Sequence, residues 1–344
     1  MFLVGFRGEQ VEPGSWLERA IVHEKVGGVV LFDRNIDKTV QNFYSPASLR
    51  KVINSVMELS DYRILIAVDQ EGGNICRLKS TDGFQLIESA EEMSGKGLEN
   101  TRQQAGRLAD MLREYNINLN FAPVVDLNSH PANPVIGKYG RSFGRDANEV
   151  TAHAQVIVEE HRKRNIGCCL KHFPGHGSSG GDSHLDFVDI SVSWRSEELI
   201  PYEKLIKTGH CDAIMTGHLV NVALDKAGLP ATLSPEMITG LLRRKLGFKG
   251  VVFSDDMQMA AVTKGWSYKK AVQLAVVAGI DMLIIGNNLL YQENAVEEGK
   301  KAIVELLEQG VVPEQRIKQS LTRIHEFTKK LQEDNCEPAK MTCP

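Results

Sequence analysis

The sequence predicts a single-domain (β/α)8 barrel, and three observations lead to this fold class. Short apolar runs recur along the chain, polar or glycine residues follow them, and amphipathic helical stretches lie between them. Alternating strands and helices indicate a parallel sheet, and eight repeats of the unit favour a closed barrel over a doubly wound open sheet, the structural alternative. The eight predicted strands are residues 2–4, 29–32, 64–68, 117–121, 166–170, 213–215, 251–253 and 282–285.

The segments between these runs have helical periodicity, and one helix start is well marked. Ser234 suits the capping position, Pro235 the first helical position and Glu236 the first turn. No linker of glycine, serine or proline interrupts residues 1–330, so we predict one domain over residues 1–334 and a C-terminal tail over 335–344. The predicted helices are residues 149–164, 197–208, 235–246, 269–278 and 302–331.

Composition excludes several classes of protein. The 344 residues include 40 basic and 44 acidic side chains, and a net charge of −4 offers no electrostatic footprint for nucleic acid. No apolar stretch is long enough to cross a membrane and no signal peptide precedes the first strand, so we expect a cytoplasmic protein. Six cysteines without a CxxC pair predict reduced thiols, and the adjacent Cys168 and Cys169 are expected to face opposite ways.

Polar side chains follow six of the eight predicted strands. In a (β/α)8 barrel the carboxyl ends of the strands meet at one face, where catalytic groups gather. We therefore expect these side chains to lie close together around a site. The side chains concerned include Asp69, Gln70 and Glu71; Asp126; Lys171, His172 and His176; His218; Asp255 and Asp256; and Asn287 and Asn288.

The loop after residues 166–170 is the richest in such groups. Four glycines between residues 175 and 181 predict that it is either mobile or tightly turned. Asp182 and His184 lie two residues apart, and in an extended segment their side chains share a face. A carboxylate beside an imidazole orients the ring and raises its pKa, which suits a general acid or base near neutral pH.

Asp255 and Asp256 are adjacent at the end of the predicted strand 251–253. Strand alternation is expected to send one carboxylate into the mouth of the barrel and the other away from it. The inward carboxylate is a candidate nucleophile, base or metal ligand.

Several of these segments together resemble the β-N-acetylglucosaminidase (NagZ-type) branch of family 3 glycoside hydrolases. The similarity runs in order over roughly residues 3–290. The motifs are Val68-Asp69-Gln70-Glu71-Gly72-Gly73 with Arg77, Asn120-Phe121-Ala122-Pro123-Val124-Val125-Asp126, Asn133-Pro134-Val135-Ile136-Gly137 with Arg141-Ser142-Phe143-Gly144, Lys171-His172-Phe173-Pro174-Gly175-His176-Gly177 with Asp182-Ser183-His184, and Phe253-Ser254-Asp255-Asp256-Met257.

The resemblance implies a retaining hydrolase that removes a terminal β-linked N-acetylglucosamine. By motif position, Asp255 is the expected nucleophile, His184 the general acid/base and Asp182 its partner. The residues expected to hold the sugar are Asp69, Arg77, Arg141, Lys171 and His172.

A histidine acid/base departs from the pair of carboxylates that glycosidases usually employ. Imidazole titrates near neutral pH without burial, which suits a loop exposed to solvent. The resemblance also implies a role in recycling cell-wall muropeptides, with a small-molecule substrate as the partner. We expect no metal or other cofactor, and a monomer, because nothing in the sequence suggests an obligate interface.

Three alternatives stay open at this point. A phosphorylase could use the same site, because a histidine does not repel an incoming phosphate as a carboxylate does. A non-catalytic sugar-binding protein would not need Asp255. A metal-dependent barrel hydrolase would draw its ligands from His172, His176, His184, His218 and Asp255.

Overall fold

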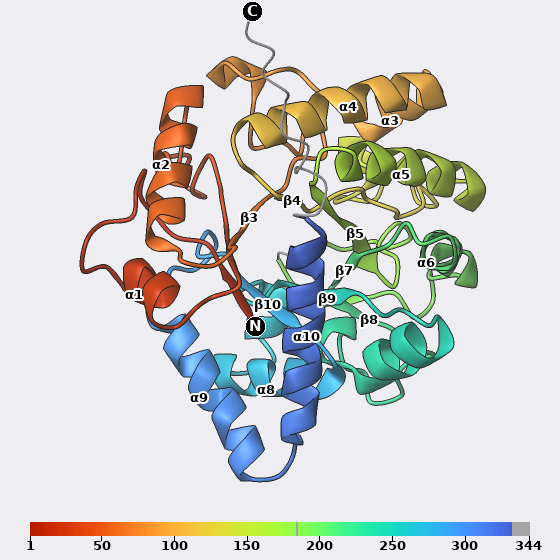
Figure 1. Ribbon diagram of the computed structural model, residues 1–344. Coiled ribbons are helices and arrows are strands. Elements are labelled where there is room, and N and C mark those ends of the chain that lie inside the picture. The colour runs from red at the N-terminus through yellow and green to blue at the C-terminus, as the bar shows by residue number, and fades with distance from the viewer. Residues whose placement is uncertain (184, 332–344) are drawn as a thin grey trace, which may run out of the picture.

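The computed structural model describes residues 1–183 and 185–331, which fold around a closed barrel of eight parallel strands (Figure 1). The barrel confirms the predicted fold class and rules out the open sheet. Around the barrel the strands follow the order β1-β2-β3-β4-β5-β7-β9-β10, and β10 closes onto β1. The strands are β1 (Phe2–Val4), β2 (Gly28–Val30), β3 (Leu65–Val68), β4 (Leu119–Asn120), β5 (Gly167–Phe173), β6 (Val188–Asp189), β7 (Ala213–Thr216), β8 (Leu219–Val220), β9 (Val251–Asp256) and β10 (Met282–Ile285).

The helices surround the barrel, and serine or aspartate side chains cap several of them. Ser45 accepts from the Ser48 amide at the start of α2, and Asp146 accepts from the Asn148 and Glu149 amides at the start of α5. The helices are α1 (Trp16–Val22), α2 (Pro46–Leu59), α3 (Ala90–Gly95), α4 (Leu98–Glu114), α5 (Ala147–Arg162), α6 (Ile200–Lys207), η5 (Glu236–Lys245), α7 (Ala260–Thr263), α8 (Tyr268–Ala278), α9 (Ala295–Glu308) and α10 (Glu314–Lys330), with short helical turns at Ser80–Asp82, Gly137–Tyr139, Ser196–Leu199 and Ala231–Leu233.

The marked helix start is confirmed, whereas one predicted helix is wrong. Ser234 Oγ accepts from the Met237 amide at 3.1 Å, as its predicted capping role requires. The single helix predicted over residues 302–331 is two helices, α9 and α10. Gly310 adopts a φ of +68° between them, and Pro313 has no amide hydrogen with which to continue a helix. The predicted tail over residues 335–344 lies outside the described residues, and the domain boundary stays a prediction.

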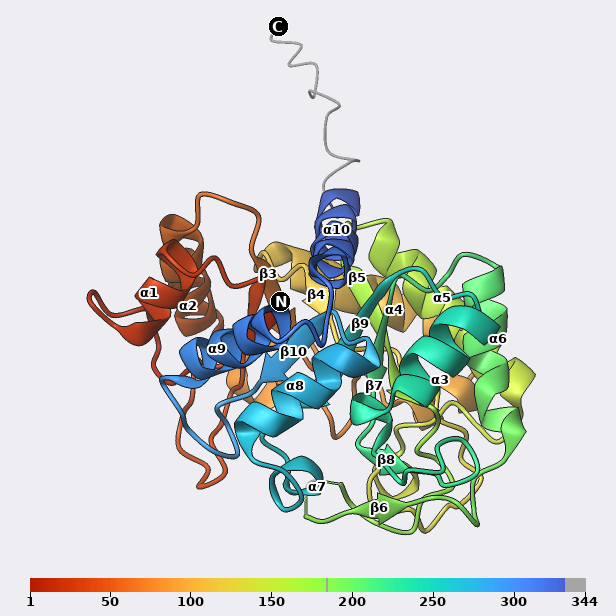
Figure 2. The same ribbon diagram turned by 90° about the horizontal axis from the view of Figure 1, so that it is seen from below.

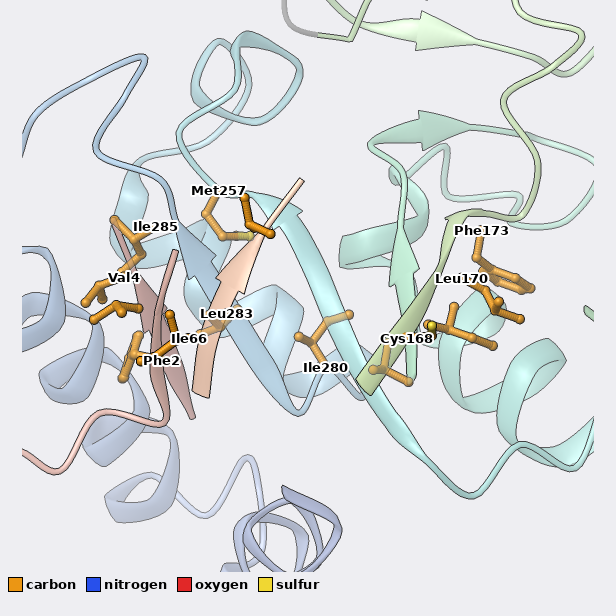
Figure 3. Packing of buried hydrophobic residues seen from close by; sticks show 14 of the residues in the cluster. Phe2, Val4, Ile66, Cys168, Leu170, Phe173, Met257, Ile280, Leu283 and Ile285 are labelled. Carbon is orange, nitrogen blue, oxygen red and sulfur yellow. The ribbon is translucent and has the colours of Figure 1, made fainter. Parts of the chain in front are cut away.

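Strand alternation separates the two largest clusters of the core, one inside the barrel and one outside it. Phe121 and Phe253 meet inside the barrel with their ring centroids 5.7 Å apart. Side chains on the outer faces of the strands pack against the surrounding helices (Figure 3). Cys169 belongs to the interior cluster and Cys168 to the outer one, so the prediction that they face opposite ways is confirmed. Because side chains alternate between the inside and the outside of the barrel, this alternation also decides which polar residues just beyond each strand point into the mouth.

The two ends of the barrel are built differently (Figure 2). Helix α10 lies at the amino ends of the strands, where Ile324 and Phe327 join the interior cluster. At the opposite end, β6 and β8 form a separate two-stranded parallel sheet that the sequence pattern did not reveal. The carboxyl ends of the strands therefore open beneath long loops. Among the described residues, no helix has the length and apolar character that crossing a membrane requires.

Asp281 anchors α10 to the barrel from a fully buried position. Its carboxylate accepts from the Val252 amide at 3.0 Å, and also from Ser320 Oγ, Arg243 Nη2 and Arg323 Nη1. These donors come from β9, η5 and α10. One buried carboxylate thus joins the neighbouring elements η5 and β9 to α10, which lies far from them in the sequence.

Replacing Asp281 with alanine should therefore lower the free energy of unfolding by about 3 kcal/mol, because it leaves partly buried arginines without their carboxylate. Urea unfolding followed by circular dichroism measures the change. Asp61→Ala is the matched control, since the Asp61 carboxylate is exposed and its ion pair is with the exposed Lys25. Equal midpoints for the two variants would contradict the anchoring role.

Candidate active site

One cavity at the carboxyl ends of the strands collects most of the predicted site residues. Every second side chain of β3, β5 and β9 points into the barrel, and Asp69, Lys171 and Asp255 follow in the same alternation. This is expected for side chains at the mouth of a barrel. Of the eight residues predicted for the site, six line this cavity. They are Asp69, Arg77, Arg141, Lys171, His172 and Asp255.

Lys171 is the centre of a buried ionic network. Its side chain is only 2% exposed, and Nζ lies 2.8 Å from Asp69 Oδ1 and 2.7 Å from Glu71 Oε1. Burial alone would lower the pKa of Lys171, but the two carboxylates raise it above its ordinary value. The ammonium therefore stays charged although it is shielded from water.

Arg141 extends the network through a two-pronged contact with Glu71. Its Nε and Nη2 atoms donate to the two carboxylate oxygens of Glu71 at 2.8 and 2.7 Å. Burial would raise the pKa of Glu71, but Arg141 and Lys171 lower it below its usual range. Arg77 approaches Asp69 at 3.4 Å, and Lys171 with Arg77 lowers the pKa of Asp69 despite burial. Every cation that lines the cavity within the described residues therefore faces a carboxylate.

His172 is oriented by Asp126, a buried carboxylate to which the sequence assigned no role. His172 Nδ1 lies 2.8 Å from Asp126 Oδ2, and the backbone amide of His172 also points at this carboxylate. Asp126 is ionised, since His172 outweighs burial and lowers the pKa of Asp126. An ionised carboxylate accepts only, so Nδ1 carries the proton, and Nε2 accepts from Arg141 Nη2 at 3.4 Å.

Asp255 and Asp256 both border the cavity, so the expectation that one points away is only partly correct. Asp256 Oδ1 accepts from the amides of Gly286 and Gln258 at 3.0 Å each, which joins β9 to the end of β10. Asp255 Oδ1 accepts from the Asp256 amide at 2.8 Å. Asp256 thus supports the backbone at this edge, and the contact to its amide orients the Asp255 carboxylate.

The first part of the loop after β5 is a fixed, tight turn, which decides between the two predicted alternatives. Asn133 Nδ2 donates to the carbonyls of His176 and Gly177 at 2.7 and 3.2 Å. The His176 amide donates to Asp126 at 2.8 Å. A Cβ on Gly177 would lie 1.7 Å from the Leu127 carbonyl oxygen, so only glycine allows this approach.

Beyond this turn the chain carries Asp182, a half-buried residue. The amides of Leu185 and Asp186 both donate to the Asp182 carbonyl, at 3.0 and 3.1 Å. The chain therefore turns after Asp182. The prediction that Asp182 and His184 share a face assumed an extended segment, and that assumption is wrong. His184, the predicted acid/base, lies outside the described residues, and its role stays a prediction.

A backbone contact joins this loop to the segment that follows Asp255. The Ala261 amide, at the start of α7, donates to the Ser183 carbonyl at 3.3 Å. Lys264 Nζ donates to the Leu185 carbonyl at 2.9 Å. Figure 2 shows α7 and the loop around β6 at the same end of the barrel. The predicted acid/base loop thus lies against the chain that carries the predicted nucleophile.

Of the histidines of the metal-dependent alternative, those that the structure describes each contact other groups. His218 Nδ1 lies 2.8 Å from Thr232 Oγ1, and its Nε2 lies 2.9 Å from the Asp256 carbonyl. Burial, with a further effect of His172, lowers the pKa of His176 to about 4, and its Nδ1 lies 2.6 Å from Ser179 Oγ. In the part of the chain that the structure describes, no three His, Cys, Asp or Glu residues are grouped so that they could hold a metal ion.

Comparison with known proteins decides the family. The family description "Glycosyl hydrolase family 3 N terminal domain" matches residues 8–327. The chain belongs to glycosyl hydrolase family 3. This membership confirms the resemblance read from the motifs, and the chain is a glycoside hydrolase.

Relatives of this family 3 chain include a protein from Tolumonas auensis named beta-hexosaminidase. It is 34% identical over 278 residues, which cover 79% of each chain. A family 3 beta-N-acetylglucosaminidase from Paenibacillus sp. str. FPU-7 has a TM-score of 0.86 and 30% identity, and the match covers 100% of this chain and 63% of that chain. The beta-N-acetylhexosaminidase from Beutenbergia cavernae DSM 12333 has a TM-score of 0.84 and 28% identity, with 95% and 96% covered.

Sequence reasoning assigned no role to three residues that support the site of this family 3 enzyme. Glu71 and Asp126 each follow a predicted strand, and this position at the mouth of the barrel was the feature of the sequence that could have indicated their roles. Asn133 lies away from any strand end, and the signal for it was its place at the start of the motif Asn133-Pro134-Val135-Ile136-Gly137. Its Oδ1 accepts from the Val135 and Ile136 amides, so one side chain joins two loops.

Glu71→Gln should lower the free energy of unfolding at pH 7 by about 3 kcal/mol, because it leaves Arg141 and Lys171 without a shared carboxylate. The lowered pKa of Glu71 means that its contribution is present above about pH 4 and is lost as the pH falls further. Urea unfolding at pH 7 and at pH 3.5 measures both effects. The exposed Glu99→Gln is the control, and a loss that does not shrink in acid would contradict the charge-based explanation.

Proposed function

We propose that this family 3 chain is a retaining exo-β-N-acetylglucosaminidase that hydrolyses terminal β-linked N-acetylglucosamine. The observation that carries the proposal is the convergence of Asp255 with Asp69, Arg77, Arg141, Lys171 and His172 in one cavity. Relatives named beta-hexosaminidase and beta-N-acetylglucosaminidase supply the sugar class.

The ionic network presents a preorganised surface to the hydroxyls and acetamide of the sugar. Asp69 offers carboxylate oxygens as acceptors, and Arg77 and Lys171 offer charged donors. Because these groups already hold one another, binding a sugar costs little ordering of side chains. His172 adds a ring whose orientation Asp126 fixes.

The proposed reaction proceeds through a covalent glycosyl-enzyme. Asp255 attacks the anomeric carbon as the bond to the leaving oxygen breaks, and His184 gives its proton to that oxygen. In the second step His184 takes a proton from water, the water oxygen bonds to the anomeric carbon, and Asp255 is released as a carboxylate. Asp182 stabilises the imidazolium form of His184 before the first step and again after the second.

The charge balance of the cavity favours hydrolysis over phosphorolysis. A phosphate nucleophile brings about two negative charges at neutral pH and needs cations that no carboxylate has neutralised. Lys171 and Arg141 share Glu71, and Asp69 faces both Lys171 and Arg77. An uncharged water molecule needs no such cation.

The proposal also includes the natural source of the sugar. The motif resemblance points to cell-wall muropeptides, from which the enzyme would remove the terminal N-acetylglucosamine. The cytoplasmic location and the monomeric state expected from the sequence stay predictions.

A colorimetric assay tests the proposal directly. We expect hydrolysis of 4-nitrophenyl β-N-acetylglucosaminide, at a rate that phosphate does not change, and at least about tenfold lower turnover of the β-glucoside, which lacks the acetamide contacts. Sugar 1-phosphate as a phosphate-dependent product would make the enzyme a phosphorylase instead. Absence of turnover with this substrate and with a muropeptide would favour a sugar-binding protein.

Leaving-group dependence separates the two catalytic roles. Asp255→Ala should lower kcat by about 10³-fold for every substrate, because it removes the nucleophile. His184→Ala should lower kcat about 10²-fold or more for a poor leaving group and far less for 4-nitrophenolate, which needs no proton. His23→Ala, at an exposed histidine, is the control. Equal losses on both substrates would show that His184 is not the acid.

A further inference from the structure

Glu198 lies beneath the loop after β5, in the helical turn Ser196–Leu199. It is 2% exposed, and its Oε2 accepts from the Gly177 amide at 3.2 Å. The contact with the loop is close, because a Cβ built on Gly175 would lie 2.6 Å from the Glu198 side chain. Moving this carboxyl group therefore requires the loop to move as well.

Two buried carboxyl groups hold consecutive amides of the loop. Asp126 accepts from the His176 amide at 2.8 Å, and Glu198 accepts from the next amide, that of Gly177. Asp126 also accepts a hydrogen bond from His172 Nδ1, whereas no ion pair joins Glu198 to a described lysine, arginine or histidine. The two anchors of the loop therefore differ in electrostatic balance.

The surroundings of Glu198 disfavour its ionised form. Burial raises the pKa of Glu198 to about 7, and the negative charge of Asp126 acts in the same direction, although contacts with Ser178 and Gly177 oppose it. From α6, Tyr202 faces the same region, and burial raises its pKa, so it brings no charge in this range. Glu198 is thus a buried group that changes charge near neutral pH.

We propose that Glu198 is a pH-sensitive positioning residue, whose neutral form fixes the loop leading to Asp182 and whose ionisation loosens it. Once ionised, Glu198 places a second negative charge beside Asp126 in a space with little water. The charge is relieved when the carboxylate swings toward solvent, which removes the acceptor of the Gly177 amide. The effect on catalysis rests on the proposed function, whereas the movement of the loop does not.

Tryptophan fluorescence of the ligand-free protein tests the movement without any substrate. Trp194 Nε1 donates to the Pro174 carbonyl at 3.0 Å, so the indole ring reports on the start of the loop. We expect the emission to change with a midpoint near pH 7 in the unmodified protein and in Glu197→Gln, the exposed neighbour. Glu198→Gln, which keeps a neutral acceptor, should lack this transition. A transition that persists in Glu198→Gln would overturn the proposal.

Hydrogen exchange provides a second measurement that needs no variant. The protection factor of the Gly177 amide should fall at least about tenfold between pH 6 and pH 8, after correction for the intrinsic rate. Amides of β7, a buried strand of the barrel wall, serve as the internal reference. Constant protection at Gly177 would contradict the proposal even if Glu198→Gln fails to fold.

The pH profile of kcat then tests the catalytic consequence. With both enzymes normalised at pH 6, Glu198→Gln should exceed the unmodified enzyme by about tenfold at pH 8, because one titrating group has been removed. Superimposed profiles would show that the loop does not affect catalysis through Glu198. An enzyme without activity on the glycoside would contradict the proposed function, while the fluorescence result would still decide the role of Glu198.

Discussion

The burial of Lys171 is the constraint on which the site depends. An ammonium group that is 2% exposed is stable only when carboxylates surround it, and here Asp69 and Glu71 do so. These carboxylates belong to the end of β3, and Glu71 in turn holds Arg141 from a distant loop. One buried cation at the end of β5 therefore dictates the conformation of three segments around the mouth of the barrel.

Such a network contributes more to geometry than to stability. Removing charged groups from water costs several kcal/mol per ion, and their mutual attraction roughly offsets that cost. The net stability must come from the apolar clusters beneath, where Phe121 and Phe253 fill the barrel and α10 covers its amino end. This division lets the mouth hold five charged side chains close together without unfolding the chain.

Sequence periodicity predicted the eight barrel strands because each apolar run is buried locally and a turn or polar segment follows it. The same pattern located Asp69, Lys171 and Asp255, since the strand phase continues past the end of the strand. The partners that orient these residues were harder to predict. Asp126 meets His172 across 46 positions and Glu71 meets Arg141 across 70, and no local pattern records such a pairing. The sheet of β6 and β8 was missed for the same reason, because two-residue strands carry no periodicity.

A side chain can titrate near neutral pH either because burial shifts its pKa or because its ordinary pKa already lies there. Glu198 is an example of the first case, and the proposed acid/base histidine is an example of the second. Glu198 reaches a pKa of about 7 only because it is almost completely buried, and a buried carboxyl group cannot approach a substrate. Asp182 is half-buried, and the chain turns immediately after it. A carboxylic acid in that more open position would stay ionised at pH 7 and could not donate a proton. Imidazole titrates near neutral pH without burial, which is the physical reason for expecting a histidine rather than the second carboxylate of most glycosidases as the acid/base.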